Sequence, residues 1–207
     1  MYIPTPFQFD DPSELHAFIR EHPFATLVST LDGAPFATHL PLRLQSADGG
    51  ALQLIGHVAR PNPHWRAFDG RSRSLAIFHG PHAYVSPAWY QTRPAVPTWN
   101  YATVHAYGPV SVIESPVEFA AEMDALLREY EQAPAIEGVV TEEIKRRMLP
   151  GIVGLRMQVE KLEGKRKLSQ NRPEADRQRV ADRLAAGDSQ ARAVAELMRH
   201  HVLSEGS

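Results

Sequence analysis

The chain has 207 residues, of which 43% are hydrophobic and 22% charged, a composition typical of a folded globular protein with room for a core. Its 22 Lys and Arg residues nearly balance its 24 Asp and Glu residues, so it lacks the positive excess that draws proteins onto nucleic-acid phosphates. No cysteine occurs, which excludes disulfides, thiolate nucleophiles and iron–sulfur clusters, so redox chemistry would need a bound cofactor. The sequence shows neither a signal peptide nor a membrane-spanning apolar run, which predicts a cytoplasmic protein.

Three pairs of a capping side chain and a proline predict helix starts, at Asp11-Pro12, Asn62-Pro63 and Ser115-Pro116. Proline suits the first helical position because its missing N–H would have no partner there. Glu14 and Glu118 complete capping boxes in the first and third helices. The third helix should be the best defined, since its apolar residues recur on one face: Phe119, Met123, Leu126, Leu127 and Tyr130.

Alternating and apolar runs between these helices predict β-structure. Asp32-Gly33 predicts a tight turn between strands at 24–31 and 35–44. Further strands are predicted at 51–58, 74–80, 82–86, 98–113 and 151–164. Six to seven mostly antiparallel strands with inserted helices favour an α+β, mainly β fold, a small split barrel rather than a doubly wound sheet.

The pattern changes to helix after Pro173. One helix is expected to end near Gly187, and Asp188 is expected to cap a last one. The sequence therefore predicts a barrel domain at 1–164. Residues 165–207 would add a basic loop and helices that pack on the barrel or on a dimer partner.

Residues 78–101 are unusually rich in aromatic rings and prolines. Proline fixes φ, so four prolines should hold this connection in one extended shape: Pro81, Pro87, Pro94 and Pro97. The rings available for stacking are Tyr84, Trp89, Tyr90, Trp99 and Tyr101. A stiff loop that presents flat rings predicts a planar ligand.

Five sequence blocks, in this order, resemble a known family. They are THLPL (38–42), GHVARPNPHW (56–65), AYVSPAWY (83–90), VPTWNY (96–101) and KLSQNR (167–172). With them the chain is similar to the PaiB family, FMN-binding negative transcriptional regulators among the split β-barrel flavoproteins related to pyridoxamine phosphate oxidase. The resemblance implies a homodimer with FMN in the groove between two subunits.

The resemblance also implies which residues hold the cofactor. Candidates for the phosphate or an anionic substrate are Arg60, Lys167, Ser169, Gln170 and Arg172. Candidates for contacts along the ribityl chain and the ring are Thr38, His39, Pro41, His57 and Asn62. Candidates for closing the partner's site, on opposite faces of one strand, are Trp99 and Asn100. No side chain is assigned as an acid–base catalyst, because the flavin ring itself transfers the electrons.

Plainer explanations stand beside these assignments. Asn62-Pro63 caps a helix whether or not a ligand is present, and the aromatic stretch could serve dimer packing alone. The basic run 165–172 could be a solvated face or touch DNA. The ten histidines show no metal-binding spacing, which predicts no metal site, although one axial histidine could hold haem.

Several functions stay open at this point. One is an FMN-dependent oxidoreductase, and another is a flavin-linked regulator of transcription. Direct DNA contact is disfavoured because the last helix carries only Arg192 and Arg199 around Glu196. A haem-binding split barrel and a cofactor-free dimeric interaction module are the alternatives. Ser86 and Ser169 lack a nucleophile elbow, which argues against a hydrolase.

Overall fold

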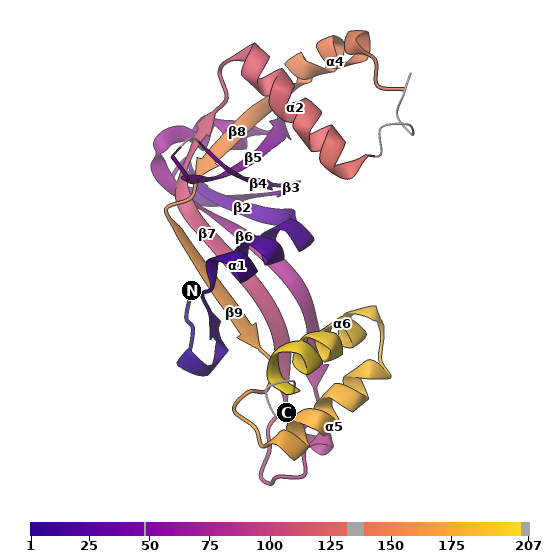
Figure 1. The fold of residues 1–207 in the computed structure, drawn as a ribbon. Helices are drawn as coiled ribbons and strands as arrows, with labels where there is room; N and C mark the ends of the chain where they lie inside the picture. Colours follow the sequence, from indigo (N-terminus) through magenta and orange to yellow (C-terminus); the bar gives the residue numbers. More distant parts are fainter. Residues whose placement is uncertain (48, 132–138, 204–207) are drawn as a thin grey trace. The chain divides into compact units, whose positions relative to one another are not determined.

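The computed structural model describes residues 1–47, 49–131 and 139–203, which form two compact units (Figure 1). Unit 1 consists of Met1–Phe18, Phe78–His105 and the chain from Glu163 onward. Unit 2 consists of Ile19–Ile77 and Ala106–Leu162. Two long strands, β6 (Asp69–Val85) and β7 (Thr98–Val112), contribute residues to both units.

Unit 2 contains an open, mainly antiparallel sheet in the order β3-β2-β6-β7-β8-β5-β4. Besides β6 and β7, its strands are β2 (Phe24–Leu31), β3 (Ala34–Pro41), β4 (Arg43–Ser46), β5 (Leu52–Ala59) and β8 (Ile152–Gln158). The β2–β3 hairpin turns at Asp32 and Gly33, which both have positive φ, as the sequence predicts. The predicted α+β split barrel is confirmed.

The helices of unit 2 are α2 (Pro116–Tyr130) and the shorter α4 (Glu142–Met148), with 3₁₀ turns η2 (Pro63–Ala67) and η4 (Leu149–Gly151). Ser115 caps α2 as predicted, because its Oγ accepts from the N–H of Glu118 at 3.3 Å.

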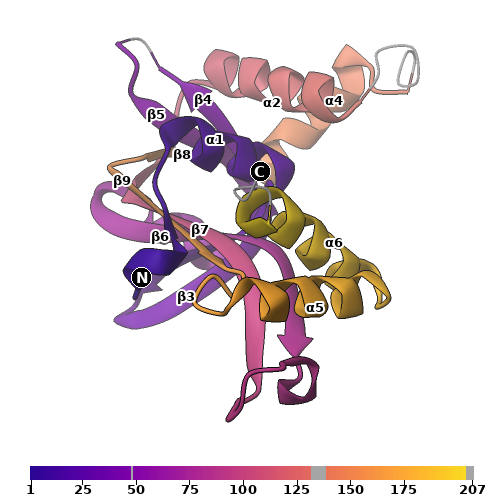
Figure 2. The same ribbon diagram turned by 60° about the horizontal axis from the view of Figure 1, so that its bottom comes forward.

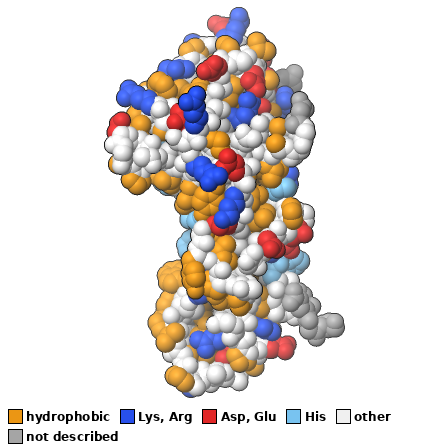
Figure 3. Space-filling view, turned by 90° about the vertical axis from the view of Figure 1, so that its left-hand side faces the viewer, with side chains coloured by type: hydrophobic (Ala, Val, Ile, Leu, Met, Phe, Trp, Pro, Cys, Tyr) orange, Lys and Arg blue, Asp and Glu red, His pale blue; other side chains and the backbone are white. Residues whose placement is uncertain are grey.

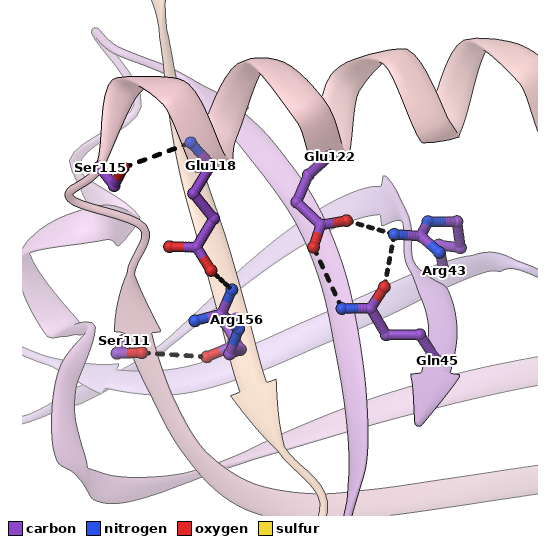
Figure 4. Close-up of polar contacts among 7 residues, drawn as sticks. All are labelled: Arg43, Gln45, Ser111, Ser115, Glu118, Glu122 and Arg156. Atoms are coloured by element: carbon purple, nitrogen blue, oxygen red, sulfur yellow. Dashed lines mark hydrogen bonds and ion pairs between the residues drawn. The ribbon is translucent and has the colours of Figure 1, made fainter. Parts of the chain in front are cut away.

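Two carboxylates, one helical turn apart, tie α2 to the strands below it (Figure 4). Glu118 forms an ion pair with Arg156 of β8, and Glu122 forms one with Arg43 of β4. The amide of Gln45 completes the second contact: it donates to Glu122 at 3.1 Å and accepts from Arg43 at 2.6 Å. Within α2 only Phe119 is fully buried, and Met123 packs against the same small core cluster, so these polar contacts and few apolar side chains hold the helix on the sheet.

In unit 1, α5 (Glu174–Ala185) and α6 (Ser189–Met198) lie side by side at the ends of β6 and β7 (Figures 1 and 2). Their apolar faces share a core with Val85, Tyr90 and Leu168. The other elements of this unit are α1 (Pro12–Glu21), β1 (Gln8–Phe9), β9 (Lys161–Lys167), the 3₁₀ turns η1 (Thr5–Phe7) and η3 (Pro87–Trp89), and the π-helical turn η5 (Arg199–Leu203). Asp188 caps α6 as predicted, since its Oδ1 accepts from the N–H of Ala191 at 2.8 Å.

Three elements differ from the sequence expectations. The runs at 74–80 and 82–86 form one continuous strand, β6, because an extended backbone tolerates both Gly80 and the φ of Pro81. The helix expected at Asn62-Pro63 is only a 3₁₀ turn. The run at 151–164 is divided between β8 and β9, which are separate strands.

The predicted boundary between residues 164 and 165 stays a prediction; in the structure both residues lie within β9. Among the described residues, no helix combines the length and the apolar character needed to cross a bilayer.

Candidate functional site

Thr38, Asn62 and His64 form a hydrogen-bonded cluster in unit 2, where the turn η2 meets strand β3. The amide Nδ2 of Asn62 donates to Thr38 Oγ1 at 3.1 Å, and Asn62 Oδ1 accepts from the N–H of His64 at 3.0 Å. Thr38 Oγ1 lies 2.8 Å from His64 Nδ1. We call these three residues the Thr38 cluster. The proline after Asn62 helps form it, because it starts the turn that brings His64 back toward β3.

His64 is a residue that the sequence analysis missed. Its side chain is fully buried, and its ring lies 5.0 Å from the rings of both Phe36 and Phe68. Burial lowers its pKa, which keeps the imidazole neutral at pH 7. Within the described part of the chain, its buried Nε2 has no hydrogen-bond partner. The only signal in the sequence was its place two residues after the capping Asn62.

The predicted contacts Thr38, His39 and Pro41 do not share one face of β3. Thr38 points toward η2, whereas His39 is exposed on the opposite face and bonds Thr26 across the hairpin at 3.0 Å. Pro41 is the last residue of the strand. Because β3 ends the strand order, one of its backbone edges remains unpaired among the strands described. A planar ligand along that edge would meet the Thr38 side chain and the strand backbone.

Arg60 follows β5 and projects its guanidinium at the surface. Its Nε and Nη2 donate to the carbonyl oxygens of Pro150 and Ile152, at 2.7 and 3.0 Å. These bonds fix the orientation of the guanidinium group and leave its other N–H groups available to an anion. Arg60 and Trp65 also line a cavity of about 600 Å³ beneath α2, whose other walls include Phe119.

His57 lies apart from the Thr38 cluster. It pairs with Gly154 of β8 and lines a second cavity, of about 300 Å³, between α2 and α4. Burial lowers its pKa, and its buried Nδ1 has no hydrogen-bond partner among the described residues. The structure therefore brings Thr38 and Asn62 together and places His57 at a different cavity.

In unit 1, Asn100 and Ser169 face the interior. Asn100 is fully buried, its Nδ2 donates to Ser169 Oγ at 3.0 Å, and Met198 Sδ lies 3.4 Å away. Ser169 adopts a positive φ of 68°. These polar atoms are engaged inside the protein rather than presented to a ligand.

The other predicted phosphate residues of unit 1 also have internal partners. Lys167 donates to the carbonyl of Trp99 at 2.7 Å and also bonds Thr98, and burial, together with the charge of Lys165, lowers the pKa of Lys167. Gln170 accepts from the N–H of Leu168 and donates to the carbonyl of Arg166, both at 2.7 Å. The Arg172 guanidinium stacks over the ring of Tyr90 at 4.5 Å.

Trp99 lies at the surface, on the face of β7 opposite to Asn100, as strand alternation predicts. Its side chain is 52% exposed, and that of Tyr84 is 47% exposed. The Trp99 ring lies 5.9 Å from Tyr84 and 6.1 Å from His82. We call these three residues the aromatic patch. Figure 3 shows one face of the protein on which hydrophobic side chains gather in several places between charged ones.

The unit 2 residues fit the requirements of FMN. A flavin site needs a cation for the phosphate, hydrogen-bond donors for the ribityl chain, and a flat surface of suitable size. Arg60 could supply the cation and the second N–H of the Asn62 amide a donor, and the ring could lie along the free edge of β3. Among the described residues, no group of three or more His, Asp or Glu side chains is placed to hold a metal ion.

Comparison with known proteins gives consistent matches over most of the chain. The family model described as "Putative FMN-binding domain" matches residues 1–161. "Protease synthase and sporulation protein PAI 2" of Bacillus subtilis is 40% identical over 202 residues, which are 96% of each chain.

Two solved structures have a similar fold at low sequence identity. The "Flavocytochrome Anf3" of Azotobacter vinelandii has a TM-score of 0.61 at 13% identity, over 77% of this chain and 69% of its own. The "FAD and Heme binding protein" of Mycobacterium smegmatis has a TM-score of 0.59 at 16% identity, over 77% and 73%.

Proposed function

Because the chain belongs to the PaiB family of FMN-binding domain proteins, we propose that it is a homodimeric flavoprotein that carries out electron transfer through bound FMN. The observation that best supports the site is the Thr38 cluster beside the free edge of β3. A hydroxyl, an amide and a buried neutral imidazole hold each other there in a fixed arrangement. Such an arrangement offers donors without the freedom that a flexible loop would have to lose on binding.

Each residue of this site has a defined part in the proposal. Arg60 binds the phosphate with the N–H groups that its two carbonyl contacts leave over. Asn62 donates to the ribityl hydroxyls or to the edge of the ring, and His64 holds Thr38 in position. His64 is a positioning residue, because its ring is buried and reaches the ligand only through Thr38.

The chemistry divides between the cofactor and the chain. When bound, FMN supplies a ring that accepts and returns electrons. The residues of this chain bind and orient it, and the neutral state of His64 avoids placing a second positive charge beside the ring.

We expect Arg60→Gln to raise the Kd for FMN about 10- to 100-fold, which corresponds to the loss of one charge-assisted contact. An absorption titration with FMN, with FAD and haem in parallel, measures this. Arg66→Gln is the matched control: Arg66 is exposed in the same turn, near the Trp65 ring, and lies outside the proposed contacts.

Three outcomes of the titration would contradict the proposal in different ways. Equal FMN affinity in Arg60→Gln would remove the phosphate role from this residue. No FMN uptake by the parent protein would overturn the flavin site and favour a cofactor-free module. Uptake of haem instead of FMN would favour the haem alternative.

The proposed dimer uses the aromatic patch to cover the flavin of the partner subunit. Exposed aromatic side chains of this kind are typical of interface hot spots. Trp99→Ser should raise the dimer dissociation constant about 30-fold, measured by sedimentation velocity. Val117→Ser, which removes an exposed apolar side chain of α2, should leave it unchanged. A monomeric parent protein, or equal effects of both variants, would contradict the proposed interface.

The role of a transcriptional regulator stays a prediction from the family resemblance. In α6, Arg192 donates to the carbonyl of Gly187 at 2.6 Å, and beyond it Arg199 lies 3.5 Å from Asp182. Arg192 and Arg199, the two basic side chains around Glu196, are thus engaged locally, which gives no support to direct reading of DNA.

A further inference from the structure

Unit 1 contains a polar cavity of about 680 Å³ that the proposed FMN contacts do not line. Its charged and polar lining residues are Gln8, Glu14, Arg166, Gln170, Glu174, Arg177 and His201. Two of these side chains are arginines, one at the end of β9 and the other on α5. From the basic run at 165–172, Arg166 and Gln170 line this cavity. Lys167, Ser169 and Arg172 are not among its lining residues.

Arg166 is held rigidly on one wall of the cavity. Its guanidinium stacks on the Phe9 ring at 3.8 Å, and Nη1 donates to Glu14 Oε2 at 2.5 Å. His201 Nδ1 lies 3.5 Å from the same nitrogen. The Nε of Arg166 is nevertheless buried, and no described residue accepts a hydrogen bond from it. The side chain therefore has a fixed orientation and a donor that is still unsatisfied.

Arg177 supplies a second unsatisfied donor. Its Nε is also buried without an acceptor among the described residues. A buried donor without an acceptor destabilises a fold, and does so more when the group is charged. Both arginines therefore line the cavity with hydrogen-bonding capacity that the described residues do not use up, and their guanidinium groups are available to a ligand there.

The charges of the cavity indicate what that ligand is. Glu14 already neutralises Arg166, so Arg177 is the cation that lacks a carboxylate partner among the described residues. Glu174 lies one turn earlier on α5 and is exposed, without an ion pair to Arg177 in the structure. An arginine fork matches the paired oxygens of a carboxylate or a phosphate, and a neutral acceptor would leave the charge unbalanced.

We propose that this cavity binds a small anion, a carboxylate or a phosphate, through Arg177 and Arg166. Gln170 supports the site indirectly, because its amide fixes the backbone at Arg166 and Leu168. The site would be separate from the flavin site, and it would involve helix α5, which lies beyond the residues that the family model matches.

The test is calorimetric titration of the full chain, saturated with FMN, with inorganic phosphate and separately with succinate. Saturation keeps the phosphate contact of Arg60 occupied. Arg177→Gln should raise the Kd of the bound anion about 10-fold or more. Glu174→Gln should lower it a few-fold, because a like charge beside the anion is removed. The matched control is Arg183→Gln, an exposed arginine on the same helix that does not line the cavity; its Kd should stay unchanged.

The titrations have clear negative outcomes. If neither anion binds the parent protein below about 10 mM, the proposal is wrong. An equal loss in Arg183→Gln would indicate general charge attraction, and a loss in Arg60→Gln without a loss in Arg177→Gln would assign the binding to the flavin site. Arg177→Lys, which keeps the charge but not the fork, guards against a folding defect and should weaken binding less than Arg177→Gln. Comparison of the two probes decides between carboxylate and phosphate.

Discussion

Replacement of Gly108 by alanine is expected to lower the free energy of unfolding by about 3 kcal/mol or more, the upper range for overpacking a core. A Cβ atom at this position of β7 would lie 1.7 Å from the carbonyl oxygen of Gln158 and 3.3 Å from the backbone N of Glu160. Neither atom can move as a side chain would, because the N–H of Glu160 donates to the Tyr107 carbonyl at 2.9 Å. The alanine would therefore separate the backbones where they approach most closely.

Urea unfolding followed by circular dichroism measures this loss. Gly151→Ala is the matched control, because a Cβ atom there meets no atom of the described residues within 4 Å and the φ of Gly151 is not positive. It should change the stability by less than about 0.5 kcal/mol. Equal midpoints for the two variants would show that the backbone contact at Gly108 is looser than the structure indicates.

Replacement of Asp176 by asparagine is expected to lower the stability of the fold by about 2 kcal/mol, because a buried charged acceptor is lost. Asp176 is 1% exposed, and its Oδ1 accepts from the N–H groups of Gln91 and Thr92, at 2.6 and 3.3 Å. These bonds hold the proline-rich loop against α5. The same variant should therefore speed amide hydrogen exchange in residues 88–97 more than elsewhere.

The pH dependence of the free energy of unfolding in the acid range provides a second measurement for Asp176. Burial raises its pKa, but the hydrogen bonds from Gln91 and Thr92 outweigh this, so the pKa lies below its ordinary value of 3.8. The unfolded chain then binds the proton more readily, so the stabilisation by Asp176 is complete above that value and is lost as the pH falls through the lowered pKa. Asp176→Asn should reduce the loss of stability on acidification, whereas Asp182→Asn, at an exposed position, should not. An equal loss of stability with falling pH in the parent protein and in Asp176→Asn would contradict the assigned role.

The sequence was sufficient to predict the sheet, the caps and the family. Ser115 and Asp188 cap their helices through their own side chains, a local interaction that needs no information from distant residues. The β2–β3 hairpin follows in the same way from Asp32-Gly33. The family assignment and its cofactor, FMN, are confirmed by the match over residues 1–161.

The environment of the side chains was harder to predict, because it depends on contacts between distant residues. Asn100 and Ser169 are 69 positions apart and bury each other, which no local pattern reveals. His64 is buried because Phe36 and Phe68 enclose it, and its place in the chain resembles that of any residue in a turn. A motif thus identified the right segments while leaving open which side chains face inward.

The ionic attachment of α2 has a consequence for ligand entry in unit 2. The two cavities described above both have α2 as a wall, and the helix is held there by Glu118 with Arg156, by Glu122 with Arg43, and by the buried ring of Phe119. Dissolved salt weakens contacts between partly exposed charges far more than it weakens burial of an aromatic ring. Rising ionic strength should therefore loosen the helix while Phe119 still anchors it, so that the salt content of the medium controls how readily molecules enter the cavities beneath α2.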